Sequence, residues 1–276
     1  MNIVRLLTAC VLLLISTMPA SAEEPDFGAP INWYYSAAFG TGVYHSDDVT
    51  VGVVRIPFTF TLGEETPDKW SSRLLLPVSL GFYNYDFDDI LELELELPNE
   101  LGTFSFLPGI EFEKYVLERW RLKPFMQFGG GFEVDGDESA TIFSMGVRSL
   151  YQFKKTPRLK LGNALIYAGF DPNEGEREST SLLITGLNYT QPIPWRSFNR
   201  ESHIGLDLNY YYYFKGLDFT PIFDDPFALQ QEIELAVTLG WSKPINILGF
   251  PLERFGLAYR YSDNISGLKL VAGHPF

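Results

Sequence analysis

The last part of the chain carries an alternation of side chains that few folds can accommodate. Between positions 254 and 261, bulky apolar residues occupy every second position, and small or charged residues lie between them. The apolar set is Phe255, Leu257, Tyr259 and Tyr261, and the set between them is Arg254, Gly256, Ala258 and Arg260. Successive side chains of a strand point to opposite faces, so one face of this strand is apolar and the other is small or charged. This pattern predicts a strand with lipid on one side and a polar interior on the other.

The same period of two recurs along most of the chain. It predicts strands over 33–39, 54–62, 70–85, 103–116, 120–129, 140–153, 159–167, 179–191, 204–214 and 233–241, followed by a final hairpin within 252–276. The count is about 12, and bacterial single-chain barrels have even numbers of strands. We therefore predict an all-β fold, a single transmembrane antiparallel up-and-down β-barrel. The Leu-Glu alternation over 91–97 fits the tip of a strand, and a helix in a loop stays open because both residue types favour helices.

The N-terminus has the features of a secretory signal over residues 1–22. Arg5 gives a positive start, residues 6–16 are mostly apolar, and Ala20-Ser21-Ala22 is a cleavage site of small residues. Residues 23–30 are then a short periplasmic leader, and 31–276 form the barrel. Beyond this signal, no stretch reaches the roughly 18 apolar residues of a spanning helix, so a membrane protein of this sequence spans as strands.

Cys10 is the only cysteine. The stretch 7–10 resembles the box that directs lipid attachment, but the apolar run follows Cys10 instead of preceding it. Removal of the signal leaves no cysteine, which excludes structural disulfides and thiolate metal sites. We expect no cofactor.

The charge of the chain is strongly negative and unevenly placed. The formal net charge is -14, and loss of Arg5 with the signal makes it -15. Such a balance argues against nucleic-acid binding, which needs a basic surface. Connections after odd-numbered strands are acidic, as in 86–100 and 171–178, and those after even-numbered strands are basic, as in 154–155. This separation predicts two oppositely charged rims, with the acidic rim outside a bacterial outer membrane.

A soluble β-sandwich or a lipocalin-like barrel is the main structural alternative. Such folds also need strands of period two, but their apolar faces point inward. The separated rim charges, the size of the chain and the charged faces of the strands near 103–116, 204–214 and 233–241 favour the membrane barrel. Tryptophans near strand ends fit the aromatic girdles of such barrels, and this set is Trp33, Trp70, Trp120, Trp195 and Trp241.

The final segment resembles the closing hairpin of autotransporter-type translocator barrels. The resemblance lies in residues 253–264, with the sequence ERFGLAYRYSDN, and 266–270, with the sequence SGLKL. Together with LPGIE at 107–111 and WRLKPF at 120–125, the chain resembles solitary outer-membrane autotransporter barrels, which lack a passenger domain. The resemblance covers most of the mature chain and implies a structural or narrow pore-like role, with no catalytic residues to transfer.

The resemblance also implies that Phe276 is part of the signal that the barrel-assembly machinery reads. Apolar residues recur at every second position before it at Leu268, Leu270 and Ala272, whereas His274 departs from the pattern. An ordinary lipid-facing aromatic is the alternative for Phe276. The expected partners are outer-membrane lipid, lipopolysaccharide and the assembly machinery, and we expect a monomer.

The alternation also places a set of charged side chains in the lumen. This set is Arg55, Arg73, Glu111, Glu113, Lys123, Arg148, Lys160, Asp207, Glu232, Glu234, Arg254, Arg260 and Lys269. A barrel of about 12 strands lies between small barrels filled by side chains and wide porins. The set therefore predicts either a narrow pore lined by charge or a network of ion pairs that fills and braces the wall.

Enzymatic activity is the weaker hypothesis. A serine hydrolase needs a histidine beside its nucleophile, and the chain has only His45, His203 and His274. His45 adjoins Ser46, but neighbouring residues of a strand point to opposite faces. An outer-membrane lipid hydrolase stays open as an alternative. The acidic connections do not have the spacing of a calcium-binding loop, and we predict no catalytic and no metal-binding residue.

Overall fold

The computed structural model describes residues 33–46, 49–63, 69–83, 102–134, 136–218, 228–247, 250–263, 265–273 and 276. One helix, α2, covers Tyr34–Ala38. The strands are β1 (Gly42–Ser46), β2 (Val49–Thr61), β3 (Ser71–Tyr83), β4 (Thr103–Phe106), β5 (Gly109–Leu117), β6 (Trp120–Glu133), β7 (Ser139–Gln152), β8 (Leu159–Pro172), β9 (Glu178–Ser197), β10 (Arg200–Asp218), β11 (Ala228–Ile247), β12 (Phe250–Tyr261) and β13 (Ser266–Val271). No helix in these ranges is long and apolar enough to cross a membrane.

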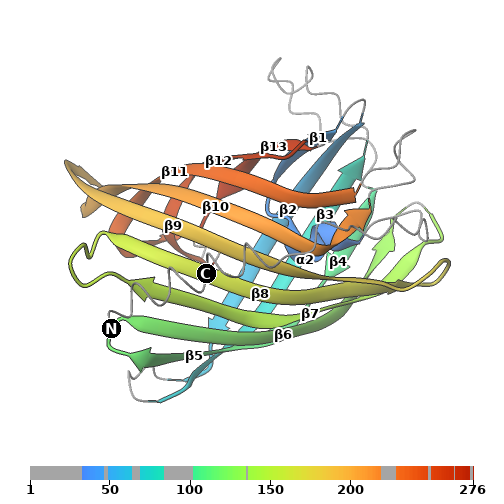
Figure 1. The fold of residues 1–276 in the computed structure, drawn as a ribbon, viewed down its shortest axis with the longest axis horizontal. Coiled ribbons are helices and arrows are strands. Elements are labelled where there is room, and N and C mark those ends of the chain that lie inside the picture. Colours follow the sequence, from blue (N-terminus) through green and yellow to red (C-terminus); the bar gives the residue numbers. More distant parts are fainter. Residues whose placement is uncertain are drawn as a thin grey trace.

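The strands form one antiparallel sheet that closes on itself. With β4 and β5 taken as one strand position, each strand pairs with the next along the chain, and β13 pairs back with β1 through Leu268 and Val43. Within the described residues the wall has 12 strand positions, because β4 and β5 share one of them. Figure 1 shows these strands as a closed wall with α2 drawn among them. The predicted all-β, up-and-down barrel of about 12 strands is confirmed.

The predicted strand over 103–116 is interrupted at Leu107 and Pro108. Pro77 of β3 lies in register with Leu107, and Pro108 follows it; a proline has no N–H to give to the sheet. Both β4 and β5 pair with β3 and with β6. The Leu107 N–H still donates to the Pro77 carbonyl oxygen at 3.1 Å. The two pieces therefore occupy one strand position.

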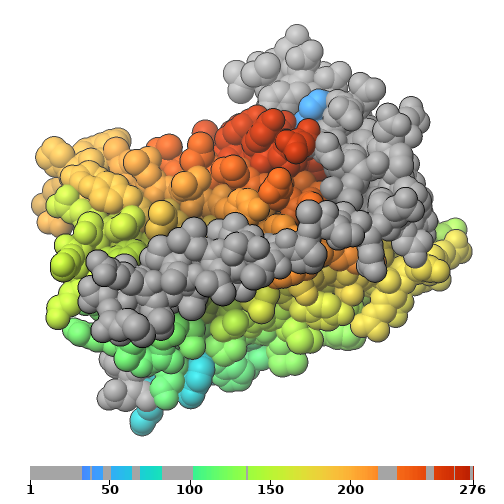
Figure 2. Space-filling model, in the orientation of Figure 1, coloured from blue at the N-terminus to red at the C-terminus, as the bar shows by residue number. Residues whose placement is uncertain are grey.

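The side chains of β11 show how the wall divides its two faces. Ile233, Leu235 and Val237 are 48%, 57% and 58% exposed, whereas Glu234 and Ala236 between them are 2% and 4% exposed. Leu257 and Tyr259 of β12 are likewise exposed, between the buried Ala258 and Arg260. The outside of the barrel is thus apolar and its charged groups are inside, which is the reverse of a soluble barrel. The strands from β6 to β13 follow one another from green to red across the face seen in Figure 2.

The predicted strand over 33–39 is wrong. Residues Tyr34–Ala38 form helix α2, which contacts β3, β7 and β8, and the wall begins instead at β1. Trp33, Tyr34 and Tyr35 are all at most 3% exposed. A strand of the wall presents every second side chain to the outside, so three successive buried aromatic residues do not fit there. They fit a segment surrounded by the wall, and Trp33 is therefore not part of an outer girdle.

The tryptophans predicted for the aromatic girdles have different positions. Trp70 and Trp195 are exposed near one end of the barrel, whereas Trp241 is only 8% exposed and donates its ring N–H to Ser197 Oγ at 2.7 Å. The hairpin between β9 and β10 turns through Phe198 and Asn199, which both have positive φ, as a two-residue turn of type I′ requires. The signal (1–22), the leader (23–30), the Leu-Glu segment (91–97) and His274 lie outside the described residues.

Candidate functional site

The barrel interior contains nearly all the charges that the alternation assigns to it, gathered mainly in three groups. The first group lies on β3, β5, β6 and β7. The Glu111 carboxylate forms ion pairs with the guanidinium groups of Arg148, at 2.7 Å, and of Arg73, at 3.6 Å. The Glu113 carboxylate forms ion pairs with the guanidinium groups of Arg73, at 2.9 Å, and of Arg121, at 3.0 Å. The two carboxylates are thus each shared between cations from neighbouring strands, which braces this part of the wall from inside.

Lys123 and the ring of Phe125 complete the first group. Lys123 Nζ lies 3.9 Å from Glu113 Oε2, and the Arg148 guanidinium lies 3.8 Å from the centre of the Phe125 ring. The ring face attracts a cation, and the contact is stronger where water is excluded. Arg121 was missed by the sequence analysis as a member of this group, although it shares the face of Lys123 on β6.

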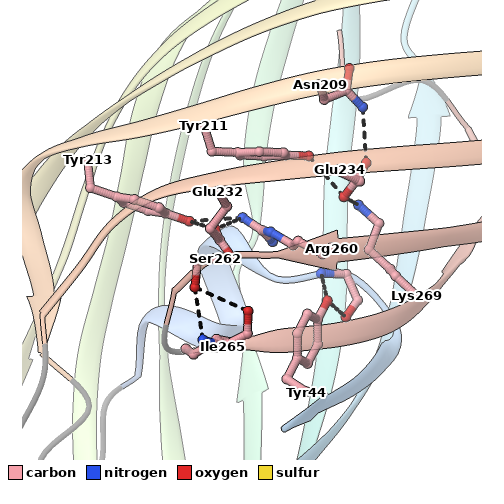
Figure 3. A network of polar contacts seen from close by, with 11 residues as sticks. Tyr44, Asn209, Tyr211, Tyr213, Glu232, Glu234, Arg260, Ser262, Ile265 and Lys269 are labelled. Atoms are coloured by element: carbon pink, nitrogen blue, oxygen red, sulfur yellow. Dashed lines mark hydrogen bonds and ion pairs between the residues drawn. The ribbon is translucent and has the colours of Figure 1, made fainter. Parts of the chain in front are cut away.

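The second group lies on β10 to β13 and is drawn in Figure 3. Arg260 pairs with Glu232, whose carboxylate also accepts the Tyr213 hydroxyl hydrogen at 2.7 Å. Both charged side chains are almost completely buried, at 1% and 0% side-chain exposure. The Arg260 guanidinium lies 4.1 Å from the centre of the Tyr211 ring, so an aromatic face covers the buried cation.

Glu234 connects the second group to the closing strand. It pairs with Lys269 of β13, accepts a hydrogen bond from Asn209 Nδ2 at 3.0 Å and another from the Tyr211 hydroxyl at 3.1 Å. These contacts join three strands, β10, β11 and β13. The network therefore ties the closing strand β13 to β10 and β11 on the inner face of the wall.

The third group is smaller and lies on β9, β10 and β12. Arg254 Nη1 donates to Asp207 Oδ2 at 2.8 Å, and Asn188 Nδ2 donates to Asp207 Oδ1 at 2.7 Å. Arg254 Nη2 also donates to the carbonyl oxygen of Gly273, beyond the end of β13. This group therefore links the wall to the residues that follow the last strand.

The two remaining charges of the set lie apart from these groups. Arg55 donates to the carbonyl oxygen of Ala37 at 3.1 Å, so it holds the α2 segment against β2. Lys160 is half-buried on β8, two residues before Gly162 and on the same face. The structure brings 11 of the 13 residues of the set into the three groups.

The N-terminal segment 33–41 occupies the interior, which the sequence analysis did not predict. The Tyr35 hydroxyl donates to Thr103 Oγ1 at 2.6 Å, and the Tyr34 hydroxyl donates to the carbonyl oxygen of Ala168 on the other side. A β-carbon placed on Gly131 would lie 2.4 Å from the Trp33 ring, so this glycine leaves room for the indole. The three aromatic residues fasten the segment to β4, β6 and β8.

An apolar core surrounds this segment. It is formed by inward side chains of the wall together with the aromatic residues of the segment itself, among them Phe39, Ile142, Phe170, Ile184 and Tyr213. Phe39 stacks on Tyr44 with 4.6 Å between ring centres, and Tyr34 meets Phe170 edge to face. The interior is thus filled by ion pairs in some places and by an aromatic core in others, instead of forming a wide charged channel.

The two ends of the barrel differ in charge. The end that holds the β6–β7 and β8–β9 connections, called the acidic end here, includes Glu133, Asp137, Glu138, Glu174 and Glu176. The opposite, basic end includes Lys154, Lys155, Arg158, Arg196, Arg200 and Lys243. Burial, and then the negative charges of Glu133 and Glu174, raise the pKa of Glu138 above its usual value.

The histidines do not form a catalytic constellation in the described part of the chain. His45 lies exposed on β1 toward the acidic end, and His203 lies on β10 close to the basic end, where its ring covers Gly240. They are therefore at opposite ends of the barrel. In the same ranges, no group of three histidine, cysteine or acidic residues is arranged to hold a metal ion.

Comparisons with known proteins give a likeness of fold. No family model matches the chain, and no curated protein matches it. Among solved structures, the chain is similar to the β domain of the Bordetella autotransporter BrkA, with 12% sequence identity and a TM-score of 0.47. The similarity covers 82% of this chain and 94% of that one.

Proposed function

We propose that the chain is an integral barrel of a bacterial outer membrane, of the autotransporter-translocator type, whose lumen is closed by its own residues. The observation that carries the proposal is the inverted polarity of the wall, seen on β11 where Leu235 is 57% exposed and Glu234 is 2% exposed. A protein in water buries its apolar side chains, and large exposed apolar surfaces mark contact with lipid or partners. A hydrocarbon layer around the barrel gives these side chains an apolar environment.

The filled interior supports a structural role over an open pore. The α2 segment and its aromatic core occupy the lumen toward the acidic end, and ion pairs between strands at most two positions apart line the inner face of the wall. A continuous water path would have to pass groups that are already bonded to one another. The proposed resting state is therefore a closed barrel that conducts no ions.

The proposed partners follow from the two surfaces. The apolar outer wall contacts outer-membrane lipid, the acidic rim faces the lipopolysaccharide outside, and the barrel-assembly machinery acts during insertion. The wall closes on itself through β1 and β13, so in this proposal a single chain is a complete barrel and the protein is a monomer. Trp70 and Trp195 are exposed near the basic end, where an amphipathic ring suits the boundary between lipid and water.

Orientation is tested with a matched pair of protease sites. One variant carries a specific protease site in the 173–177 connection at the acidic end, and the other carries it in the 154–158 connection at the basic end. Protease added to intact cells is expected to cut only the first protein, in the outer-membrane fraction, and both proteins after lysis. Recovery of the unmodified chain in the soluble fraction, or cutting only at 154–158 from outside, contradicts the proposal.

Phe276 as an assembly signal is a separate prediction of the proposed function. Deletion of Phe276 is expected to reduce the amount of folded barrel in the outer membrane several-fold, because the assembly machinery would lose its terminal aromatic. The measurement is the heat-modifiable band of the folded protein on a gel, with a Phe170→Ala variant as the control for loss of a buried aromatic residue. Equal folded amounts for the deletion and the control refute the signal.

A further inference from the structure

Phe276, beyond the end of β13, does not continue the wall but lies in the lumen. β13 ends at Val271, and Phe276 is only 6% exposed, inside the apolar core of the interior. The lipid-facing position considered for this aromatic residue is therefore wrong. The Phe276 ring is therefore held by residues on the inner face of the wall.

The site that holds this ring is built from two facing glycines and a lysine. Gly162 of β8 lies directly opposite Gly186 of β9, and neither has a side chain to fill the interior above it. A β-carbon on Gly162 would lie 2.1 Å from the Phe276 ring, and one on Gly186 would lie 2.9 Å from it. Contacts this short are not tolerated, so the ring occupies the space that two missing side chains leave. Lys123 Nζ then donates to the main-chain oxygen of Phe276 at 3.2 Å.

Gly273 and Phe276 are held by cations from opposite walls of the barrel. Arg254 of β12 holds the carbonyl oxygen of Gly273 at 2.7 Å, whereas Lys123 of β6 holds that of Phe276. Around the described wall, β6 is six strand positions from β12 in either direction, so the two cations stand on opposite sides. Lys123, Gly162 and Arg254 all lie in the parts of their strands nearer the basic end.

We propose that Gly162, Gly186 and Lys123 form a binding site for an aromatic side chain with an adjacent main-chain oxygen, and that Phe276 occupies it as a latch that narrows the basic half of the lumen. The N-terminal segment closes the other half. The latch also supplies oxygen acceptors to Lys123 and Arg254, in an interior where basic side chains outnumber acidic ones. A cation buried in this interior needs such acceptors.

The test uses a fluorine label at the ring. The full chain carries 4-fluorophenylalanine at position 276 alone and is folded in detergent micelles, and its 19F resonance is measured with and without a hydrophilic paramagnetic reagent. The seated ring is expected to give a shifted resonance with at least fivefold less relaxation enhancement than the same label in the urea-unfolded chain. Enhancement equal to that of the unfolded chain overturns the proposal without any variant.

Gly162→Ala provides the second arm, because its methyl group fills the site while Phe276 itself is retained. Its label is expected to move to the resonance of the unfolded chain and to become accessible to the reagent. Gly52→Ala is the matched control, since a β-carbon there lies 3.6 Å from its nearest neighbour, in ordinary contact. Heat-modifiable migration shows that both variants are folded barrels. A folded Gly162→Ala protein whose label stays protected, as in Gly52→Ala, overturns the proposal.

Discussion

Glu232→Gln is expected to lower the free energy of unfolding of the barrel by about 3–5 kcal/mol, the usual effect of removing one partner of a buried ion pair. Glutamine keeps the size of the side chain but removes the charge that faces Arg260. The Arg260 side chain is 1% exposed, so water cannot replace the lost carboxylate. Within the described residues, Arg260 Nε and Nη1 already have no hydrogen-bond acceptor, which leaves the guanidinium especially dependent on Glu232. The measurement is the guanidinium unfolding midpoint in detergent micelles, followed by tryptophan fluorescence.

Two controls separate the lost charge from lost packing. Glu253→Gln removes an exposed carboxylate of β12 and is expected to change the free energy of unfolding by less than about 0.5 kcal/mol. The double variant Glu232→Leu with Arg260→Met removes both buried charges, and it is expected to recover most of the loss because no unpaired ion is left. A Glu232→Gln barrel as stable as the Glu253→Gln control shows that the pair contributes nothing.

The second large effect is expected when the N-terminal segment is released from the lumen. Replacing Trp33, Tyr34 and Tyr35 with alanine removes the three side chains that fasten it to the wall, including the hydrogen bond to Thr103. The unmodified barrel is expected to show no current steps in a planar lipid bilayer. The triple variant is expected to show discrete steps, because half of the lumen loses its occupant and the remaining latch gives only partial closure.

The sign of the permeating ion is also expected from the interior. Of the 13 inward charges that the sequence predicted, eight are basic and five are acidic. Although the whole chain carries -14, the opened lumen should therefore prefer anions, as a reversal potential in a potassium chloride gradient reports. The control replaces Trp70, Trp195 and Phe198, which are 52%, 59% and 69% exposed. Steps in this control, or none in the inner triple variant, contradict the proposed plug.

Much of the wall could be predicted because the residue type at each wall position depends mainly on two things. These are its two neighbours across the sheet and whether its side chain faces the lipid or the lumen. Over 232–239 of β11 and 254–261 of β12, outward apolar positions and inward small or charged positions follow a strict period of two. A spanning strand with a single lipid-facing side leaves its residues no other arrangement. Tyr211 and Tyr213 were open to prediction as well, since they share the inner face of Asp207 and Asn209.

The errors arose where a residue's partner lies far away in the sequence. Residues 33–39 alternate as a strand would. Whether they join the wall or lie in the lumen depends on the space that the closed wall leaves inside, and Gly131 and Gly81 provide such space. The break at Leu107 depends on Pro77 being its neighbour across the sheet. A local pattern contains neither the closure of the barrel nor the pairing of its strands.

The chain by itself determined the class of fold, the inward and outward faces of the strands and the opposite charges of the two ends. These follow from side-chain alternation and from the parity of the connections, which are local quantities. Only the tertiary structure decided that the lumen is occupied by residues 33–41 and by Phe276, and which cation meets which carboxylate. The contacts of residues 33–41 and Phe276 reach strands on different sides of a closed ring, and the ion pairs join strands one or two positions apart. Both depend on the pairing and closure of the sheet, which exist only once the ring has formed.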